Sequence, residues 1–152
     1  SDEDSGALYF SGGELIIEGS VMNNNTAGTH GGVMTLGGLS SSDGTWASFS
    51  YTTMSGNSAE YYGGAIYLQN SDSEAVEVNI SESSFSSTSV NYSPAGTIQF
   101  SDNSGLASVI GTNITFVNNT SDDVYFSGGN SFNSDGTVGV MECANDSCLI
   151  DE

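Results

Sequence analysis

The chain has 152 residues, a length typical of one domain, and carries 19 acidic side chains but no lysine or arginine, for a formal net charge of −19. Without cations to contact phosphates, nucleic-acid binding and attachment to an anionic membrane surface are excluded. No apolar run reaches the 18 residues of a membrane span. Hydrophobic residues make up 36% of the chain and strong helix formers are scarce, which favours an all-β domain over disorder.

The first element in chain order is a short apolar strand that recurs at intervals of about 32 residues. It follows Gly6, the pairs Gly31-Gly32 and Gly63-Gly64, and Ala95-Gly96. In most copies the large apolar residues occupy the second and fourth positions, as expected for strands with one buried face. The predicted strands are residues 7–10, 33–36, 65–68, 97–100 and 124–126.

A second strand lies between successive copies of the first. In the third copy, Val76, Val78 and Ile80 alternate with Glu77 and Asn79, which is the period of a half-buried strand. The predicted strands of this kind are residues 15–17, 46–50, 76–80 and 107–110.

The third element is a large apolar residue followed, three positions later, by asparagine. It occurs at residues 22–25, 54–57 and 116–119, and a degenerate copy at 85–88 ends in Thr88 instead. Because the repeat would bring these positions into register, we predict that three asparagines stack as a hydrogen-bonded ladder. They are Asn25, Asn57 and Asn119.

Three short strands per repeat, joined by glycine and asparagine turns, are typical of a parallel β-helix, in which stacked coils bury a core that one coil cannot bury alone. We therefore predict one domain over residues 1–152 with about five coils, side loops at 39–44 and 69–74, and a C-terminal cap at about 137–152. The chain starts at Ser1 without methionine, which we interpret as a mature secreted product or a piece of a longer chain.

The segment Asn57–Tyr67, which contains Gly63-Gly64-Ala65-Ile66, resembles the repeats of chlamydial polymorphic outer-membrane proteins. Those repeats are marked by Phe-x-x-Asn and Gly-Gly-Ala-Ile. The resemblance extends from Gly6 to Gly129, although Thr88 departs from the asparagine position. It implies a right-handed parallel β-helix, or solenoid, exposed outside the cell and used for adhesion or surface architecture. It implies no catalytic residue.

Covalent modifications are predicted at two kinds of residue. Cys143 and Cys148 are the only cysteines, and an even number in a secreted chain favours a disulfide that holds the last coil. Of the Asn-x-Ser/Thr sequons, four are expected to point outward and to accept N-linked glycans. These are Asn24, Asn79, Asn113 and Asn118.

Catalysis and metal binding are not predicted. Asp122-Asp123 is the only adjacent acidic pair between the termini that could be considered for hydrolysis, and neighbours on a strand point to opposite faces. The only histidine, His30, is expected in a loop. No cofactor is expected; calcium is the one ion left open, with oxygen ligands from residues 2–4, Asp43 and the pair at 122–123.

The sequence thus predicts a non-catalytic extracellular protein, secreted or at the cell surface. In one hypothesis, poorly capped apolar ends make it a subunit of a fibre that assembles head to tail with copies of itself. In the alternative, it is an adhesin module whose side loops bind a glycan or a partner surface. The aromatic platform of that adhesin would be Trp46, Tyr51, Tyr61 and Tyr62.

Overall fold

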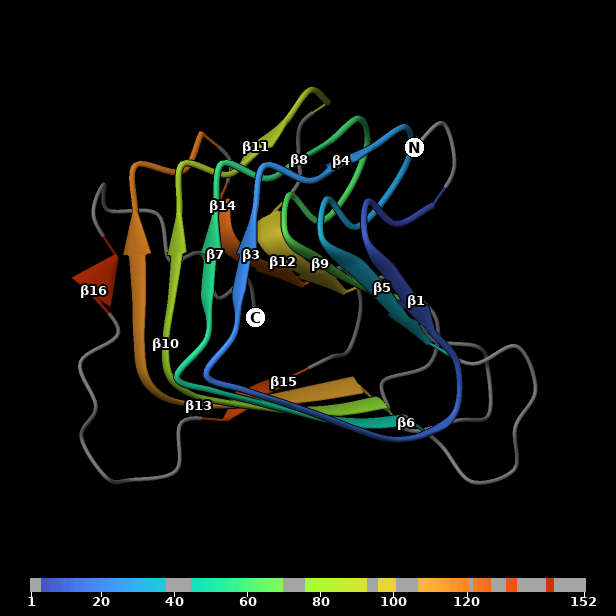
Figure 1. The fold of residues 1–152 in the computed structure, drawn as a ribbon, viewed down its shortest axis with the longest axis vertical. Coiled ribbons are helices and arrows are strands. Elements are labelled where there is room, and N and C mark those ends of the chain that lie inside the picture. Colours follow the sequence, from blue (N-terminus) through green and yellow to red (C-terminus); the bar gives the residue numbers. More distant parts are fainter. Residues whose placement is uncertain are drawn as a thin grey trace.

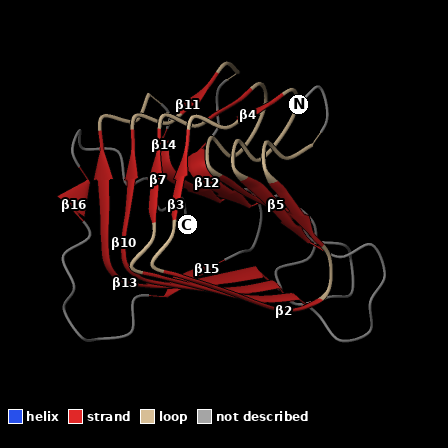
Figure 2. Ribbon diagram, in the orientation of Figure 1, coloured by secondary structure: helices blue, strands red, loops and turns tan. Residues whose placement is uncertain are grey.

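The structure is a computed structural model that describes residues 4–37, 45–69, 76–92, 96–100, 107–120, 122–126, 131–133 and 142–143. Within these residues every regular element is a β-strand (Figure 2). Every strand pairing is parallel. The predicted all-β class is therefore confirmed. The part of the chain that is described contains no helix able to cross a membrane.

The first sheet has five strands and is built from the element that follows each glycine step. Its pairing follows the sequence repeat: Met34 lies beside Ile66, and Ile66 beside Ile98. Met34, Leu36, Ile66 and Leu68 are fully buried, as their alternation predicted, but the opposite face is not exposed, because Thr35 and Tyr67 are buried as well. In spatial order the strands are β1 (Leu8–Phe10), β5 (Met34–Gly37), β9 (Ile66–Gln69), β12 (Gly96–Phe100) and β14 (Asp122–Phe126).

The second sheet has eight strands and contains both of the other apolar elements. In the third and fourth repeats the two elements form one long strand, whereas the sequence predicted two separate segments. In the first and second repeats a short break separates them. The strands are β2 (Gly13–Glu18), β3 (Val21–Asn23), β6 (Thr45–Ser50), β7 (Thr53–Ser55), β10 (Val76–Ser86), β13 (Ala107–Val117), β15 (Ser131–Asn133) and β16 (Glu142–Cys143).

Each repeat turns at two corners, where single residues adopt the left-handed backbone conformation at equivalent places. One corner is formed by Gly19, Tyr51, Glu82 and Asn113, with φ between 48° and 58°. A second corner is formed by Asn24, Gly56, Ser87 and Asn118, with φ between 53° and 64°. Glycine and asparagine tolerate this conformation, whereas tyrosine, glutamate and serine reach it at an energetic cost.

A small third sheet follows the second corner. Its strands pair in register, with Ala27 beside Ala59 and Ala59 beside Val90. The three strands are β4 (Thr26–Ala27), β8 (Ser58–Ala59) and β11 (Ser89–Val90).

One hydrophobic cluster joins side chains from the first and second sheets, which lie on different sides of it (Figure 1). Equivalent residues of successive repeats form rows inside it; Met22, Met54, Phe85 and Phe116 lie in register. The rings of Phe85 and Phe116 stack with centroids 5.2 Å apart. The buried members are Ile17, Val33, Met34, Leu36, Ala47, Phe49, Met54, Ala65, Ile66, Leu68, Val78, Ile80, Phe85, Ile98, Ile114 and Phe116.

Several predictions fall on parts of the chain that the structure does not describe. The side loop at 39–44 lies entirely outside the described residues, and only Gln69 of the loop at 69–74 lies within them. Of the proposed cap at 137–152, only Glu142 and Cys143 are described, as strand β16.

Candidate binding surface around His30

Two turns stack on each other and carry a group of aromatic side chains at the surface. One joins β4 to β5 and the other joins β8 to β9, and each contains a glycine with positive φ, 62° at Gly31 and 63° at Gly63. The turns are hydrogen-bonded to each other: Gly31 N donates to Tyr62 O at 2.9 Å, and Gly32 N to Gly63 O at 2.9 Å. His30 and Tyr62 form a parallel β-bridge, so their side chains leave the backbone at equivalent places.

This register assembles a cluster of rings. The imidazole of His30 stacks on Tyr62, with centroids 5.2 Å apart and planes at 15°, and on Tyr67, at 4.7 Å and 18°. Tyr61 stacks on Tyr92 of the next repeat, at 4.9 Å and 10°. Tyr61 and Tyr62 are 6.5 Å apart and join the two stacks. We call His30, Tyr61, Tyr62, Tyr67 and Tyr92 the aromatic cluster.

The aromatic cluster has a buried base and an exposed rim. Tyr67, on strand β9, is 8% exposed, whereas Tyr61 and Tyr62 are each 39% exposed and Tyr92 is 56% exposed. Large apolar rings are costly to leave in water, and grouped exposed rings mark interaction sites more often than single ones do. The exposed rim is therefore the main candidate for recognition.

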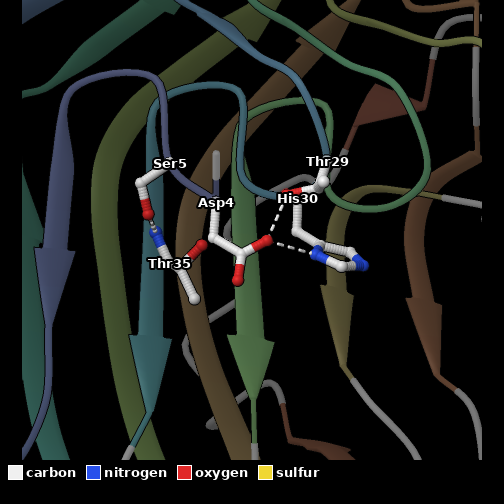
Figure 3. Close-up of polar contacts among 5 residues, drawn as sticks. All are labelled: Asp4, Ser5, Thr29, His30 and Thr35. Carbon is white, nitrogen blue, oxygen red and sulfur yellow. Dashed lines mark hydrogen bonds and ion pairs between the residues drawn. The ribbon is translucent and has the colours of Figure 1, made fainter. Parts of the chain in front are cut away.

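Asp4 completes the surface with a carboxylate. Its Oδ1 lies 2.7 Å from His30 Nδ1 and accepts a hydrogen bond from Thr29 Oγ1 (Figure 3). The hydrogen bonds from Thr29 and His30 lower the pKa of Asp4 below its usual value of 3.8, against the raising effect of partial burial. The other edge of the imidazole points away from Asp4 (Figure 3).

Ser5, the residue after Asp4, holds this segment in place through two hydrogen bonds. Ser5 N donates to His30 O at 2.8 Å, and Ser5 Oγ accepts from Thr35 N at 3.1 Å (Figure 3). Ser5 has a positive φ of 77°, as Gly31 and Gly63 have at the equivalent turns. The two hydrogen bonds of Ser5 thus hold the carboxylate of the preceding residue, Asp4, beside His30.

The aromatic platform predicted from sequence is only partly assembled. Tyr61 and Tyr62 do come together, but among the described residues neither Trp46 nor Tyr51 has a ring contact with them. The indole of Trp46 donates to Glu77 Oε1 at 3.2 Å on strand β10, and Tyr51 stands 65% exposed at the first corner. Their places are taken by His30, Tyr67 and Tyr92, which sequence reasoning missed although His30–Tyr62 and Tyr61–Tyr92 keep the repeat spacing.

The asparagines of the predicted ladder make two separate sets of contacts. Asn57 is fully buried; its Oδ1 accepts from Asn25 N at 2.9 Å and from Asn25 Nδ2 at 3.1 Å. Its Nδ2 donates to Met22 O at 2.9 Å. Asn57 thereby satisfies backbone groups of the preceding repeat as well as the side chain of Asn25.

Asn119 repeats this geometry against a threonine. Its Oδ1 accepts from Thr88 N at 3.0 Å and from Thr88 Oγ1 at 2.8 Å. Thr88 Oγ1 also lies 2.6 Å from Thr97 Oγ1. The hydroxyl pair of Thr88 and Thr97 therefore occupies the repeat in which the asparagine is missing.

Three of the four predicted glycosylation sites lie at corners. Asn24, Asn113 and Asn118 are exposed and have φ of 57°, 51° and 54°. Asn79 is half-buried on strand β10 and donates to Glu77 Oε1 at 3.2 Å. Asparagine is favoured in the left-handed conformation for its own sake, so the corner positions give these residues a structural reason besides glycosylation.

The remaining predicted sites lie largely outside the described residues. Cys148 is not described, and only the backbone of Cys143 is, so the disulfide stays a prediction. Of the candidate calcium ligands, Asp4 is the one whose side chain is described, and it is engaged by Thr29 and His30. Over the described residues, no three His, Cys, Asp or Glu side chains gather closely enough to hold a metal ion.

Comparison with known proteins finds no matching family model, no similar curated protein and no similar solved structure. The case for a function therefore rests on the geometry of this chain.

Proposed function

We propose that this chain is a right-handed parallel β-helix that serves as a non-catalytic structural module outside the cell, and that copies of it assemble head to tail into a fibre. The closed helical path, its handedness and the extracellular location belong to the proposal. Its support is the parallel register of three sheets at a spacing of 31 or 32 residues along most of the described chain.

The observation that carries the assembly is an open edge on every sheet at the N-terminal side. Within the described residues, β1 pairs only with β5, β2 only with β6, β3 only with β7 and β4 only with β8. Unpaired edge strands attract further strands. Two apolar side chains also stand in water on these edges: Ile16 on β2 is 64% exposed and Val21 on β3 is 69% exposed.

A second copy of the chain suits this edge because successive repeats already pair with one another through equivalent parallel strands. A contact between unlike ends does not close on itself and so builds a filament. The high negative charge opposes association at low salt and is screened at high salt. Assembly should therefore increase with ionic strength.

The test compares edge variants by sedimentation velocity and electron microscopy over a range of salt concentrations. Ile16→Asp and Val21→Asp add charge at exposed edge positions and are expected to abolish filaments. Tyr51→Asp adds the same charge at an exposed corner of the second repeat, between β6 and β7, which are not edge strands, and should leave filaments intact. An unmodified chain that stays monomeric at high concentration and high salt would refute head-to-tail assembly.

The proposal includes N-linked glycans at Asn24, Asn79, Asn113 and Asn118. Exposure of the three corner asparagines supports it. The intact mass of the protein from its native source, measured before and after peptide N-glycosidase treatment, tests it. An unchanged mass would leave these asparagines with their backbone role alone.

A second candidate function is that of an adhesin module, and the aromatic cluster is the observation that favours it. Grouped tyrosines on an exposed rim provide contact area with little conformational freedom to lose on binding. Replacing Tyr61 and Tyr62 by alanine should abolish adhesion and leave fibre assembly unchanged. The reverse outcome would favour the structural role alone.

A further inference from the structure

The chemistry of the exposed rim limits what can bind there. The chain has no lysine or arginine and a formal net charge of −19, so an anionic ligand would be repelled at long range. Asp4 adds a fixed carboxylate next to the rings, and it is 47% exposed. A cation would be attracted both by this field and by the negative faces of the tyrosine rings.

The stacking geometry favours one kind of cation over another. Tyr61 and Tyr92 are nearly parallel, with planes at 10° and centroids 4.9 Å apart. Tyr92 is also the most exposed ring of the aromatic cluster, at 56%. A planar guanidinium stacks on an aromatic face and can extend such a row by one layer, whereas an ammonium group acts as a point charge.

We propose that the rim formed by Tyr61, Tyr62 and Tyr92, together with Asp4, binds arginine side chains in a basic segment of a partner protein. In this arrangement one guanidinium stacks on Tyr92, and a second cationic side chain pairs with the carboxylate of Asp4. The proposal rests on the adhesin role, and it specifies the chemistry of the partner that the adhesin would bind. It is independent of head-to-tail assembly.

The surface is accessible for such a partner because its rings and its carboxylate remain partly exposed. Tyr67, the buried member of the aromatic cluster, contacts His30 and Tyr62. The hydrogen bonds of Asp4 from Thr29 and His30 both end on Oδ1 (Figure 3). Charge complementarity, rather than buried area, selects the partner here. Such complementarity mainly raises the association rate and the specificity.

The experiment titrates the whole chain with three synthetic peptides of equal length by isothermal calorimetry at physiological salt. One carries four arginines, one four lysines, and one only glycine and serine. We expect the arginine peptide to bind more tightly than the lysine peptide, and the neutral peptide not to bind. Equal affinities for arginine and lysine would overturn the stacking and leave only the general attraction between opposite charges.

Two tyrosine variants with closely matched exposure locate the site. Tyr92→Leu should weaken binding of the arginine peptide about three- to fivefold, the effect of losing one exposed cation–π contact. Tyr51→Leu changes a similarly exposed tyrosine, 65% against 56%, outside the aromatic cluster and should leave the affinity unchanged. Equal loss in both variants, or no loss in Tyr92→Leu, would refute the assignment.

Two further measurements test the site without a tyrosine variant and separate peptide binding from assembly. In the unmodified chain, the ring-proton resonances of Tyr92 should shift saturably as the arginine peptide is added, and absence of a shift would refute the site without any variant. Val21→Asp, which is meant to block assembly, should bind the peptide normally. Saturable binding of a neutral oligosaccharide at the same rings, without binding of the peptide, would replace the proposal by a glycan site.

Discussion

Residues 13–37 and residues 45–69 follow the same four-strand pattern, β2 to β5 and β6 to β9, yet equivalent side chains differ in burial. Phe49 is fully buried, whereas Ile17, its partner in register, retains 9% exposure. Met54 is fully buried and Met22 only partly so. The difference arises because β6, β7 and β8 have neighbours on both sides, while among the described residues β2, β3 and β4 have a neighbour on one side only.

This comparison shows that the repeat pattern does not by itself determine how much a residue stabilises the fold. In a chain whose repeats contact only their neighbours, stability is close to a sum of terms within repeats and between adjacent repeats. A side chain in the second repeat takes part in two such interfaces. The equivalent side chain in the first repeat takes part in one.

The largest expected effect is a glycine substitution that costs more stability in the first repeat than in the second, the opposite of the ranking by burial. A Cβ added to Gly32 would lie 2.0 Å from Gly64 O and 2.7 Å from Ser58 O, whereas for one added to Gly64 the nearest atom of the described residues is Ser89 O, at 3.1 Å. We expect Gly32→Ala to cost more than about 3 kcal/mol of unfolding free energy and Gly64→Ala about 1 kcal/mol. Urea denaturation of both variants measures this difference, and a cost of only about 1 kcal/mol for Gly32→Ala would contradict the close approach of Gly32 to Gly64 O.

The asparagine pair should give the next largest difference. Asn57→Ala removes the acceptor of Asn25 N and the donor to Met22 O, and buried backbone groups without partners are costly. We expect a loss of about 2 to 3 kcal/mol. Asn25→Ala removes only the side-chain bond to Asn57 and should cost about 1 kcal/mol. A double variant that costs no more than Asn57→Ala alone would confirm that the two residues act through one bond.

At the first corner, the two repeats carry glycine and tyrosine at equivalent places, so substitutions in opposite directions can test the cost of the positive φ. Gly19 has φ of 58° with open space around its Cβ position, and Tyr51 has φ of 51° at the equivalent place. Gly19→Ala should therefore destabilise the chain by about 1 kcal/mol through the backbone alone, and Tyr51→Gly should stabilise it by a similar amount. Thermal unfolding followed by circular dichroism checks both signs. A loss of stability in Tyr51→Gly would mean that the tyrosine ring contributes more than its backbone costs.

The smallest effect concerns the contact of Asp4 with Thr29 and His30 in the neighbouring turn. Because the pKa of Asp4 is lowered below 3.8 in the folded chain, its ionised form stabilises the fold at higher pH. That contribution decreases as pH falls through the range below 3.8. The stability difference between the unmodified chain and Asp4→Asn should accordingly shrink on acidification from pH 5 to pH 2, measured by chemical denaturation. A difference that stays constant would mean that the charge of Asp4 plays no part.

The sequence alone determined most strands of the first two sheets and the apolar face of each, but it did not predict the small third sheet or the burial of Thr35 and Tyr67 on the other face of the first sheet. Residues 65–68 were predicted as a strand and are observed as Ile66–Gln69, with Ile66 and Leu68 inside. This succeeded because the pleat alternates side chains between two faces, so the apolar pattern records the position of the core. Glycine and asparagine also marked several corners, since they tolerate positive φ at little cost.

The repeat spacing predicted some contacts across repeats, such as that between Asn25 and Asn57, whereas the tertiary structure alone decided others. Tyr51, Glu82 and Ser87 adopt positive φ although their types disfavour it, because the pairing of the flanking strands imposes the bend. Likewise, His30, Tyr67 and Tyr92 carry no local signal for a common site. They come together because parallel pairing superimposes one turn on the next, and register is a property of neighbouring strands that no single segment contains.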